Sequence, residues 1–473
     1  MAYCSTRGEA PQLSFTEALL AGLAPDGGLY VPEAMPRLAP EILRGFAGKS
    51  YVEVAEAVIS PFLDADMPTD DFRAMLEAAY STFRHKAVAP LAQIDDNLFV
   101  LELFHGPTLA FKDVAMQLLG RLMDRALKAH GKRATIVGAT SGDTGAAAIE
   151  AFRGLDQVDV FILYPHGRVS DVQRRQMTTV AADNIHAIAL EGTFDDAQAM
   201  LKSFFRNKPL REELGLSGVN SINFARVVAQ TVYYFTAAAV LGGPLRKVSF
   251  TVPTGNFGDI LAGHMARQMG LPIEKLVVAT NSNDILARAL ETGRYEVRGV
   301  HATQSPSMDI QVSSNFERLL FDAVGRDPAA IRGLMASLDQ SGAFDIPPAA
   351  LTKIRQEFAA GAASEADTAG EIARTWRECE YLLDPHTAVA VHVARKNLAR
   401  DPSTPMVALG TAHPAKFPDA VRAATGVSAP LPAHLADLFE RQERFDVLPN
   451  DEQTVAAFIR ARARVITQAQ NGG

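Results

Sequence analysis

The chain has 473 residues, a hydrophobic share of 48% and a formal net charge of −8 at pH 7. The acidic balance argues against a general electrostatic grip on nucleic acid or on an anionic membrane. Its two cysteines, Cys4 and Cys379, form neither a disulfide framework nor a zinc set. The N-terminal stretch lacks the apolar core of a secretory signal, and the most apolar run, near 231–243, is too short to span a bilayer. We therefore expect a cytoplasmic protein that binds no nucleic acid and no membrane.

The first 95 residues have a mainly helical pattern, clearest over 14–24 and 51–63. Between these segments, 26–36 predicts a turn, a short strand and a proline-bounded loop. From residue 97 the pattern changes to a buried strand, a loop over 105–113 and a helix that begins directly afterwards.

Strands and helices then alternate regularly along the chain. Strands are expected at 134–139, 158–165, 185–192, 247–254, 275–281 and 404–414, and helices at 146–153, 170–180, 194–206, 223–241 and 259–269. Apolar strands that alternate with amphipathic helices predict an α/β fold, with parallel sheets covered by helices on both faces. Ligands of such sheets bind beyond the carboxyl ends of the strands. The charged, helical stretch 315–380 is expected to be a surface insertion.

Lys112 is the first candidate for chemistry. It follows the apolar run Leu109, Ala110, Phe111 and precedes a helix with Val114 and Leu118 on one face. Burial and a helix N-terminus both disfavour a protonated amine, which is how a lysine becomes a nucleophile toward carbonyls. The alternative is a surface lysine, with Asp113 supplying charge at the start of the helix.

Two glycine-containing loops and one threonine complete the candidate site. In TGNFGDI (254–260), two glycines and a helix N-terminus suit a phosphate, although the loop matches neither the dinucleotide fingerprint nor the Walker pattern. In GATSGDTGAA (138–147), hydroxyls and glycines suit a carboxylate, while Asp143 or Thr144 could simply cap the helix. Thr411 ends a strand, and its hydroxyl could meet a ring nitrogen. Together with Lys112, these features fit pyridoxal phosphate (PLP) held as a Schiff base.

The histidines favour packing over catalysis. His413 precedes a proline and is expected to be packed and hydrogen-bonded, and His264, His386 and His392 lack metal-ligand company. No HExxH motif or clustered Cys/His set occurs, so we expect no metal site.

At this point the chain resembles a known family, the threonine synthases in their longer bacterial and fungal form. The resemblance covers nearly the whole chain. It rests on STRG (5–8), SFTEALLAGLAPDGGLYVPE (14–33), FHGPTLAFKD (104–113), ATSGDTG (139–145), SPSMDIQVSSNFERLLF (305–321) and TAHPAKFP (411–418). The family implies the tryptophan-synthase-β-like fold, or fold type II of PLP enzymes, with a mostly helical N-terminal domain.

The resemblance also implies residue roles. Lys112 would bind the cofactor covalently and then move protons. The cofactor phosphate would lie on Gly255, Asn256, Phe257 and Gly258, and Thr411 would meet the ring nitrogen. The ring hydroxyl and substrate carboxylate would be faced by Ser141, Asp143 and Thr144. The substrate implied is O-phospho-L-homoserine, and the candidates for its phosphate are Lys202, Asn223 and Arg226.

The expected domains are an N-terminal one (1–95), a large PLP-binding one (96–135 and 250–473) and a smaller, mobile α/β one (136–249). We expect a monomer or a weak homodimer. Three alternatives remain open: a serine or threonine dehydratase or other β-replacing enzyme of the same fold, a catalytically silent relative that binds phosphorylated metabolites, and, more remotely, a nucleotide kinase.

Overall fold

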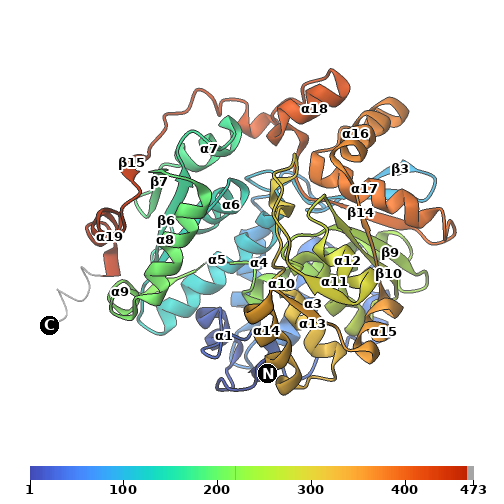
Figure 1. The fold of residues 1–473 in the computed structure, drawn as a ribbon, viewed down its shortest axis with the longest axis horizontal. Helices are drawn as coiled ribbons and strands as arrows, with labels where there is room; N and C mark the ends of the chain where they lie inside the picture. Colours follow the sequence, from blue (N-terminus) through green and yellow to red (C-terminus); the bar gives the residue numbers. More distant parts are fainter. Residues whose placement is uncertain (219, 466–473) are drawn as a thin grey trace. The chain divides into compact units, whose positions relative to one another are not determined.

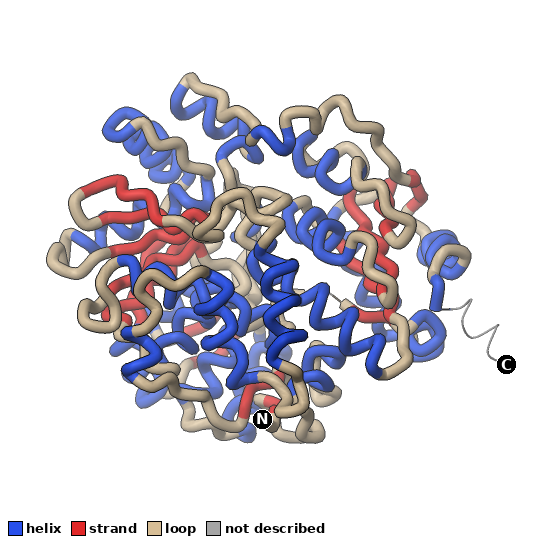
Figure 2. The backbone as a smooth tube through the Cα atoms, turned by 180° about the vertical axis from the view of Figure 1, so that it is seen from behind, coloured by secondary structure: helices blue, strands red, loops and turns tan. Residues whose placement is uncertain are grey.

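The computed structural model describes residues 1–218 and 220–465. These residues form two compact units (Figure 1): unit 1 comprises Met1–Phe111 and Ser221–Ala429, and unit 2 comprises the chain from Lys112 to residue 220 with the C-terminal segment from Pro430. Each unit contains its own sheet, and Figure 2 shows the strands in red gathered with helices in blue beside them.

The described part of unit 1 is built on a six-stranded sheet in the order β13-β10-β9-β14-β4-β3. Its strands are β3 (Leu91–Asp95), β4 (Leu98–Glu102), β9 (Val248–Pro253), β10 (Ile273–Thr280), β13 (Phe358–Ala362) and β14 (Met406–Gly410). Only β3 pairs antiparallel; the other pairings are parallel. The carboxyl ends of β4, β9, β10 and β14 therefore lie at one edge, where ligands of such sheets bind.

Helices, short strands and 3-10 turns complete unit 1. The helices are α1 (Phe15–Ala21), α2 (Pro40–Arg44), α3 (Tyr51–Ile59), α4 (Thr69–Tyr80), α10 (Phe224–Val240), α11 (Gly258–Gln268), α12 (Ile285–Thr292), α13 (Phe316–Ala323), α14 (Pro328–Ser341), α15 (Pro348–Glu357), α16 (Glu365–Cys379), α17 (Pro385–Leu398) and α18 (Pro418–Thr425). The antiparallel pairs are β1 (Tyr3–Ser5) with β2 (Tyr30–Pro32), and β11 (Arg294–Glu296) with β12 (Ala343–Asp345). The 3-10 turns are η1 (Ser60–Phe62), η2 (Pro306–Met308) and η3 (Pro414–Lys416).

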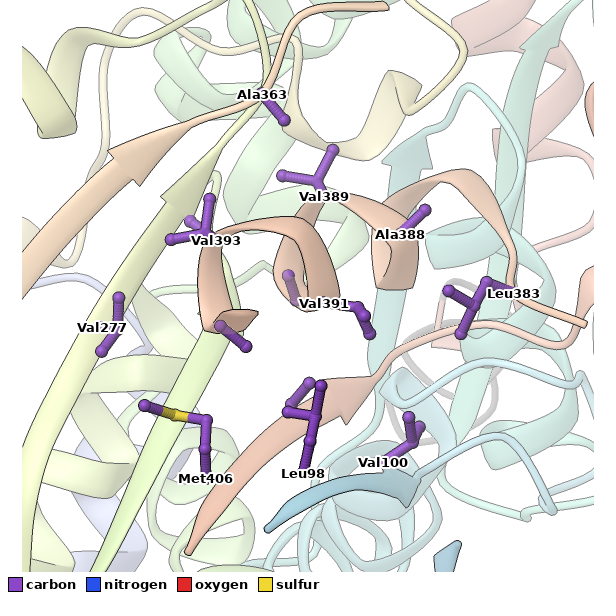
Figure 3. Close-up of a cluster of buried hydrophobic side chains, with 14 of the residues drawn as sticks. Leu98, Val100, Val277, Ala363, Leu383, Ala388, Val389, Val391, Val393 and Met406 are labelled. Atoms are coloured by element: carbon purple, nitrogen blue, oxygen red, sulfur yellow. The ribbon is translucent and has the colours of Figure 1, made fainter. Parts of the chain in front are cut away.

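One hydrophobic cluster of this unit lies between α17 and the sheet. Figure 3 shows side chains of α17, among them Val391 and Val393, across from Leu98 of β4 and Met406 of β14. All four side chains are at most 4% exposed. Burying a side chain of this size contributes about 1.5–3 kcal/mol, so this packing fixes the strands whose ends carry the candidate loops.

Unit 2 holds the second sheet, whose described strands run β15-β7-β6-β5-β8 and are all parallel. They are β5 (Ala134–Ala139), β6 (Val158–Pro165), β7 (Ile185–Glu191), β8 (Leu216–Ser217) and β15 (Asp446–Pro449). The helical elements are α5 (Lys112–Ala129), α6 (Asp143–Phe152), α7 (Asp171–Thr178), α8 (Phe194–Arg206), α9 (Lys208–Leu214), α19 (Glu452–Arg460) and the 3-10 turn η4 (Ala433–Leu435).

The expected α/β fold with helix-covered parallel sheets is confirmed, and the expected strands and helices appear at or close to their predicted positions. The expectation for 315–380 is wrong, because β13 joins the main sheet beside β10. The charged residues of α13 in that stretch are also buried: Glu317 is 7% exposed and Arg318 is 2% exposed. Both have partners inside the protein, Arg7 for Glu317 and backbone carbonyls for Arg318.

The compact units are bounded differently from the three expected domains. The segment 1–95 lies in unit 1, the smaller unit begins at Lys112, and β15 of the C-terminal segment pairs with β7 of unit 2. The division into three domains, 1–95, 96–135 with 250–473, and 136–249, stays a prediction. No helix among the described residues is long and apolar enough to cross a membrane.

Candidate active site

Lys112 is the first residue of α5, and its side chain is buried. Its Nζ atom lies 3.6 Å from Oδ2 of Asp143, the first residue of α6. The sequence predicted an apolar niche around this amine, but the structure also places a buried carboxylate beside it. Gln173 of α7 holds that carboxylate, with its Nε2 donating to Oδ1 of Asp143 at 2.9 Å.

The loop before Lys112 is held on both sides within unit 1. The phenol of Tyr381 and Nε2 of His105 each lie 2.7 Å from a different oxygen of Glu102, at the end of β4. Nζ of Lys416 donates to the carbonyl oxygen of Thr108 at 2.7 Å, and this lysine is fully buried. Leu109 adopts φ of 60°, which is uncommon for a residue other than glycine. A backbone held in this way presents Lys112 in one position.

The 139–145 loop connects β5 to α6 in unit 2. The alternative interpretation, in which Asp143 or Thr144 caps the helix, is wrong: the N-cap residue is Gly142, without a side-chain cap. Instead, Oγ1 of Thr140 accepts hydrogen bonds from the backbone N–H groups of Gly142 and Gly145, both at 3.0 Å. Ser141 is exposed and Thr144 is half-buried. Neither residue is buried, and both lie at the start of a helix, which is compatible with a role in carboxylate binding.

The phosphate loop, residues 254–258, joins β9 to α11 in unit 1. Phe257 is the N-cap residue of α11 and adopts φ of 63°. The ring of Phe257 packs against Phe316 and Phe358. Such strain in a bulky residue costs about 1–3 kcal/mol and persists where the surroundings impose it, often at ligand sites. Within the described part of the chain, the N–H groups of Asn256, Phe257 and Gly258 donate to no protein acceptor. The loop therefore fits an anion such as a phosphate.

The two glycines of the phosphate loop differ in what surrounds them. A Cβ atom on Gly255 would lie 2.8 Å from the carbonyl oxygen of Ser307, so the protein itself excludes a side chain there. A Cβ atom on Gly258 would meet Nδ2 of Asn315 at 3.4 Å, an ordinary contact. A glycine at 258 is thus not required by the protein's own packing.

Thr411 follows β14 and is buried. Its carbonyl oxygen accepts from the N–H of Phe111 at 2.9 Å, and its own N–H donates to Oγ1 of Thr387 at 3.2 Å. Thr387 in turn bonds to the buried carboxylate of Asp384. These bonds fix the backbone of Thr411 through partners that no local sequence signal indicated.

The three candidates for the substrate phosphate lie in different surroundings. Lys202 is exposed on α8. The amide of Asn223 is the N-cap of α10: Oδ1 accepts from the N–H of Ala225 at 3.1 Å, and Nδ2 donates to Leu19 O at 2.9 Å. Because both polar atoms of Asn223 have protein partners, the structure gives it a structural role, and its role in phosphate binding stays a prediction.

Arg226 lies in the first turn of α10 and is 5% exposed. Burial lowers the pKa of its guanidinium, and the neighbouring Tyr233 and Asp259 partly offset this lowering. Its Nη1 atom is buried and has no hydrogen-bond partner among the described residues. A buried cation with a spare donor is compatible with anion binding, and also with a structural role beside the carboxylate of Asp259.

The histidines are packed, as expected for His413. Nδ1 of His413 accepts from the N–H of Ala415 at 3.1 Å and caps η3. His264 bridges Glu357 and Asp322. In the described residues, no group of three or more His, Cys, Asp or Glu side chains is arranged to hold a metal ion.

Comparisons with known proteins agree with these features. The family description "Pyridoxal-phosphate dependent enzyme" matches residues 83–409, "Threonine synthase N terminus" matches 2–80, and "Threonine synthase, C-terminal" matches 387–459. A threonine synthase of Pseudomonas aeruginosa is 55% identical over 460 residues, which cover 97% of this chain and 98% of that protein.

Solved structures give the same result. The crystal structure of PLP-bound threonine synthase from Brucella melitensis has a TM-score of 0.97 and 60% identity, over 98% of this chain and 100% of that one. Threonine synthase from yeast has a TM-score of 0.93 and 39% identity, over 98% of each chain. The fold and loops therefore define a PLP-dependent enzyme of fold type II. Within that class, the chain belongs to the threonine synthase family.

Proposed function

We propose that this chain converts O-phospho-L-homoserine and water into L-threonine and phosphate, with PLP as its cofactor. The observation that carries the proposal is the buried amine of Lys112 beside Asp143 in unit 2. The sheet of unit 1 carries a phosphate-fitting loop at 254–258. Family membership at 55% identity supports the reaction, since both ends of the chain match threonine synthases.

Each residue has a defined task in this proposal. Gly255, Asn256, Phe257 and Gly258 bind the cofactor phosphate through backbone N–H groups, and Thr411 faces the ring nitrogen with a neutral hydroxyl. Ser141 and Thr144 bind the substrate carboxylate. Bound PLP supplies an electron-withdrawing ring that stabilises negative charge at the substrate's Cα.

Lys112 carries out the proton transfers. Its amine first holds the cofactor and, once released, removes the proton from Cα of the substrate. Asp143, held by Gln173, fixes the position of that amine. Removal of a Cβ proton then lets the Cγ–O bond break, so that the γ-phosphate departs. A proton is returned to Cγ, the hydroxyl of water adds at Cβ, and a proton is returned to Cα, which gives threonine. Arg226 and Lys202 are the proposed cationic partners of the departing phosphate, with Asn223 as a further donor.

The test is to load the protein with PLP and measure phosphate release and threonine formation from O-phospho-L-homoserine. Equal amounts of the two products support the proposal. Homoserine and threonine are the control substrates, because a dehydratase of the same fold would consume threonine instead. Lys112→Ala should lose turnover and the yellow colour that borohydride bleaches in the wild type. Threonine formation by Lys112→Ala above a trace would contradict the role of Lys112.

The proposal includes a cytoplasmic location and a monomer or weak homodimer. Sedimentation at several protein concentrations tests the oligomeric state. A mass above that of a dimer at every concentration would contradict a monomer or weak homodimer.

A further inference from the structure

Residues 305–315, which we call the brace segment, contact the phosphate loop without being part of it. Apart from η2, the segment has no helix or strand. The carbonyl oxygen of Ser307 and Cδ1 of Ile310 lie 2.8 and 3.0 Å from the place of a Cβ atom on Gly255. The brace segment therefore lies directly against the backbone of the phosphate loop.

Three hydrogen bonds from the brace segment reach carbonyl oxygens of the phosphate loop. Oγ of Ser313 donates to Gly255 O at 2.6 Å. The backbone N–H and Nδ2 of Asn315 both donate to Asn256 O, each at 3.1 Å. In a trans peptide, the C=O of one residue and the N–H of the next point in opposite directions. These bonds therefore direct the N–H groups of Asn256 and Phe257 away from the brace segment.

The amide of Asn315 can take only one orientation. Nη1 of Arg318 donates to its Oδ1, and a guanidinium has no acceptor atoms. Oδ1 must therefore face Arg318, which leaves Nδ2 to donate to the carbonyl oxygens of Asn256 and Ser221. Arg318 is itself fixed, because Nη2 donates to Tyr30 O at 2.9 Å and to Ile222 O at 2.7 Å. The N-terminal signature thus contributes, through Tyr30, to the orientation of Asn315.

The brace segment is anchored at its other contacts too. The hydroxyl of Tyr295 accepts from the N–H of Ser313 at 2.8 Å, and the ring stacks on Phe344 with centroids 4.8 Å apart. The carboxylate of Asp309 accepts from side chains or backbone of Asn281, Asn283 and Thr303. Ser313 is 4% exposed and Asn315 is fully buried. A donor held this firmly can impose an orientation on its acceptor.

We propose that Ser313 and Asn315 are positioning residues for the cofactor phosphate, which act by holding the peptide groups of the phosphate loop with their N–H groups toward it. The proposal rests on the proposed function, in which residues 254–258 bind that phosphate. It assigns a task to the motif SPSMDIQVSSNFERLLF (305–321), to which the proposed function gives no catalytic residue.

The decisive variant is Asn315→Asp. The carboxylate still accepts from Arg318, but it has no donor for Asn256 O and opposes that oxygen with its own charge. We expect the dissociation constant of PLP to rise about 10- to 100-fold. The N–H groups of Asn256 and Phe257 would lose their orientation toward the charged phosphate, and a hydrogen bond to a charged group is worth about tenfold or more. The phosphorus-31 shift of bound PLP should change as well. Ser313→Ala should show a smaller change in the same direction.

Asn397→Asp is the matched control, because Nδ2 of Asn397 also donates to a backbone carbonyl, that of Val393 at 2.9 Å, in α17. Urea unfolding of each apoprotein separates positioning from stability. PLP affinity and phosphorus-31 shifts like those of the wild type in both brace variants would overturn the proposal. The proposal would also be overturned if the brace variants lost PLP affinity only in proportion to their loss of apoprotein stability, and by no more than Asn397→Asp. A wild type that binds PLP but forms no threonine would contradict the proposed function alone, while a wild type that fails to bind PLP would overturn both.

Discussion

The backbone N–H of Phe111 donates to the carbonyl oxygen of Thr411 at 2.9 Å. The bond belongs to a short antiparallel contact in which Ala110 bridges to Ala412 and His413 N donates to Leu109 O at 3.0 Å. The residue directly before Lys112 is thus fixed to the residue proposed to face the ring nitrogen. Movement of either segment would shift the lysine and the ring partner together.

Thr411→Asp should therefore change the chemistry without moving Lys112. A carboxylate at this position favours a protonated ring nitrogen, whereas a hydroxyl does not. We expect kcat to fall about tenfold or more, with an altered visible spectrum of the PLP-loaded enzyme and new side products. Thr411→Ser is the control and should keep the wild-type spectrum. An Asp variant with an unchanged spectrum and unchanged products would show that residue 411 does not face the ring nitrogen.

Gln173→Leu tests the support of the catalytic amine. The variant removes the 2.9 Å hydrogen bond to Asp143, whose other oxygen lies 3.6 Å from Nζ of Lys112. A hydrogen bond to a charged group is worth about 1.5–3 kcal/mol net, so kcat/KM should fall by about tenfold or more. Gln93→Leu, at an exposed site in β3, is the control. Equal kinetics for the wild type and Gln173→Leu would remove Gln173 from the support of Asp143.

Gly258→Ala distinguishes a ligand requirement from a packing requirement. The added Cβ meets Nδ2 of Asn315 at 3.4 Å, so the apoprotein should fold with nearly unchanged stability. A phosphate that approaches the backbone closely would meet the new methyl group, and we expect the dissociation constant of PLP to rise about tenfold. Calorimetric titration with PLP measures it. Gly333→Ala in α14 is the control, since its Cβ would meet nothing within 4 Å. Unchanged PLP affinity in Gly258→Ala would place the phosphate elsewhere.

Much of the fold could be predicted because its signals are local. The apolar runs of β5 and β9 and the periodic face of α5 lie within short windows, and each appears close to its predicted position. The sequence analysis missed several strands, namely β1, β3, β8, β11, β12, β13 and β15. Two of them show the physical reason. β13, FAAGA, consists of small residues and a glycine, and β15 is short and mostly exposed. Neither has the apolar alternation or continuous apolar run that predicts a strand.

The candidate site was predictable where its residues form loops at strand ends, as for Lys112 and the phosphate loop. The supporting residues were not, because their partners are far apart in sequence. Asp143 and Gln173 are 30 residues apart, and Asn256 and Asn315 are 59 apart. Thr140, which bonds within its own loop, could have been found locally, as a hydroxyl before a glycine turn. The roles of Ser141, Thr144, Lys202, Asn223 and Arg226 toward the substrate stay predictions.

Arg226→Ala tests whether this buried cation serves the substrate phosphate. If it does, binding of the phosphorylated substrate should weaken about 10- to 150-fold, because charge-assisted bonds are worth about 1.5–3 kcal/mol. Binding of homoserine or norvaline should change little. Arg326→Ala is the control, since Arg326 pairs with Asp322 and donates to Pro32 O, which are structural contacts. Equal losses for all ligands in Arg226→Ala, as expected for Arg326→Ala, would move the phosphate partner to Lys202.

His264 should make the stability of unit 1 depend on pH. Its Nδ1 lies 2.7 Å from Glu357 and its Nε2 lies 3.3 Å from Asp322. Burial alone would lower the pKa of His264, but the hydrogen bonds to Asp322 and Glu357 outweigh burial and raise it to about 9. Since the folded pKa exceeds the ordinary value of 6.5, the contribution of the charged imidazole is fully present below pH 6.5. It is lost as pH rises through about 9.

The expected loss is about 3 kcal/mol between pH 6.5 and 9, because each unit of pKa shift corresponds to about 1.4 kcal/mol. Urea unfolding of the apoprotein across this range measures it, and His264→Gln should flatten the curve. His392→Gln is the control, because burial lowers the pKa of His392, so that folding does not favour its charged form. A wild-type curve that is flat from pH 6.5 to 9, or a His264→Gln curve as steep as that of the wild type, would show that the imidazole is not charged between its two carboxylates.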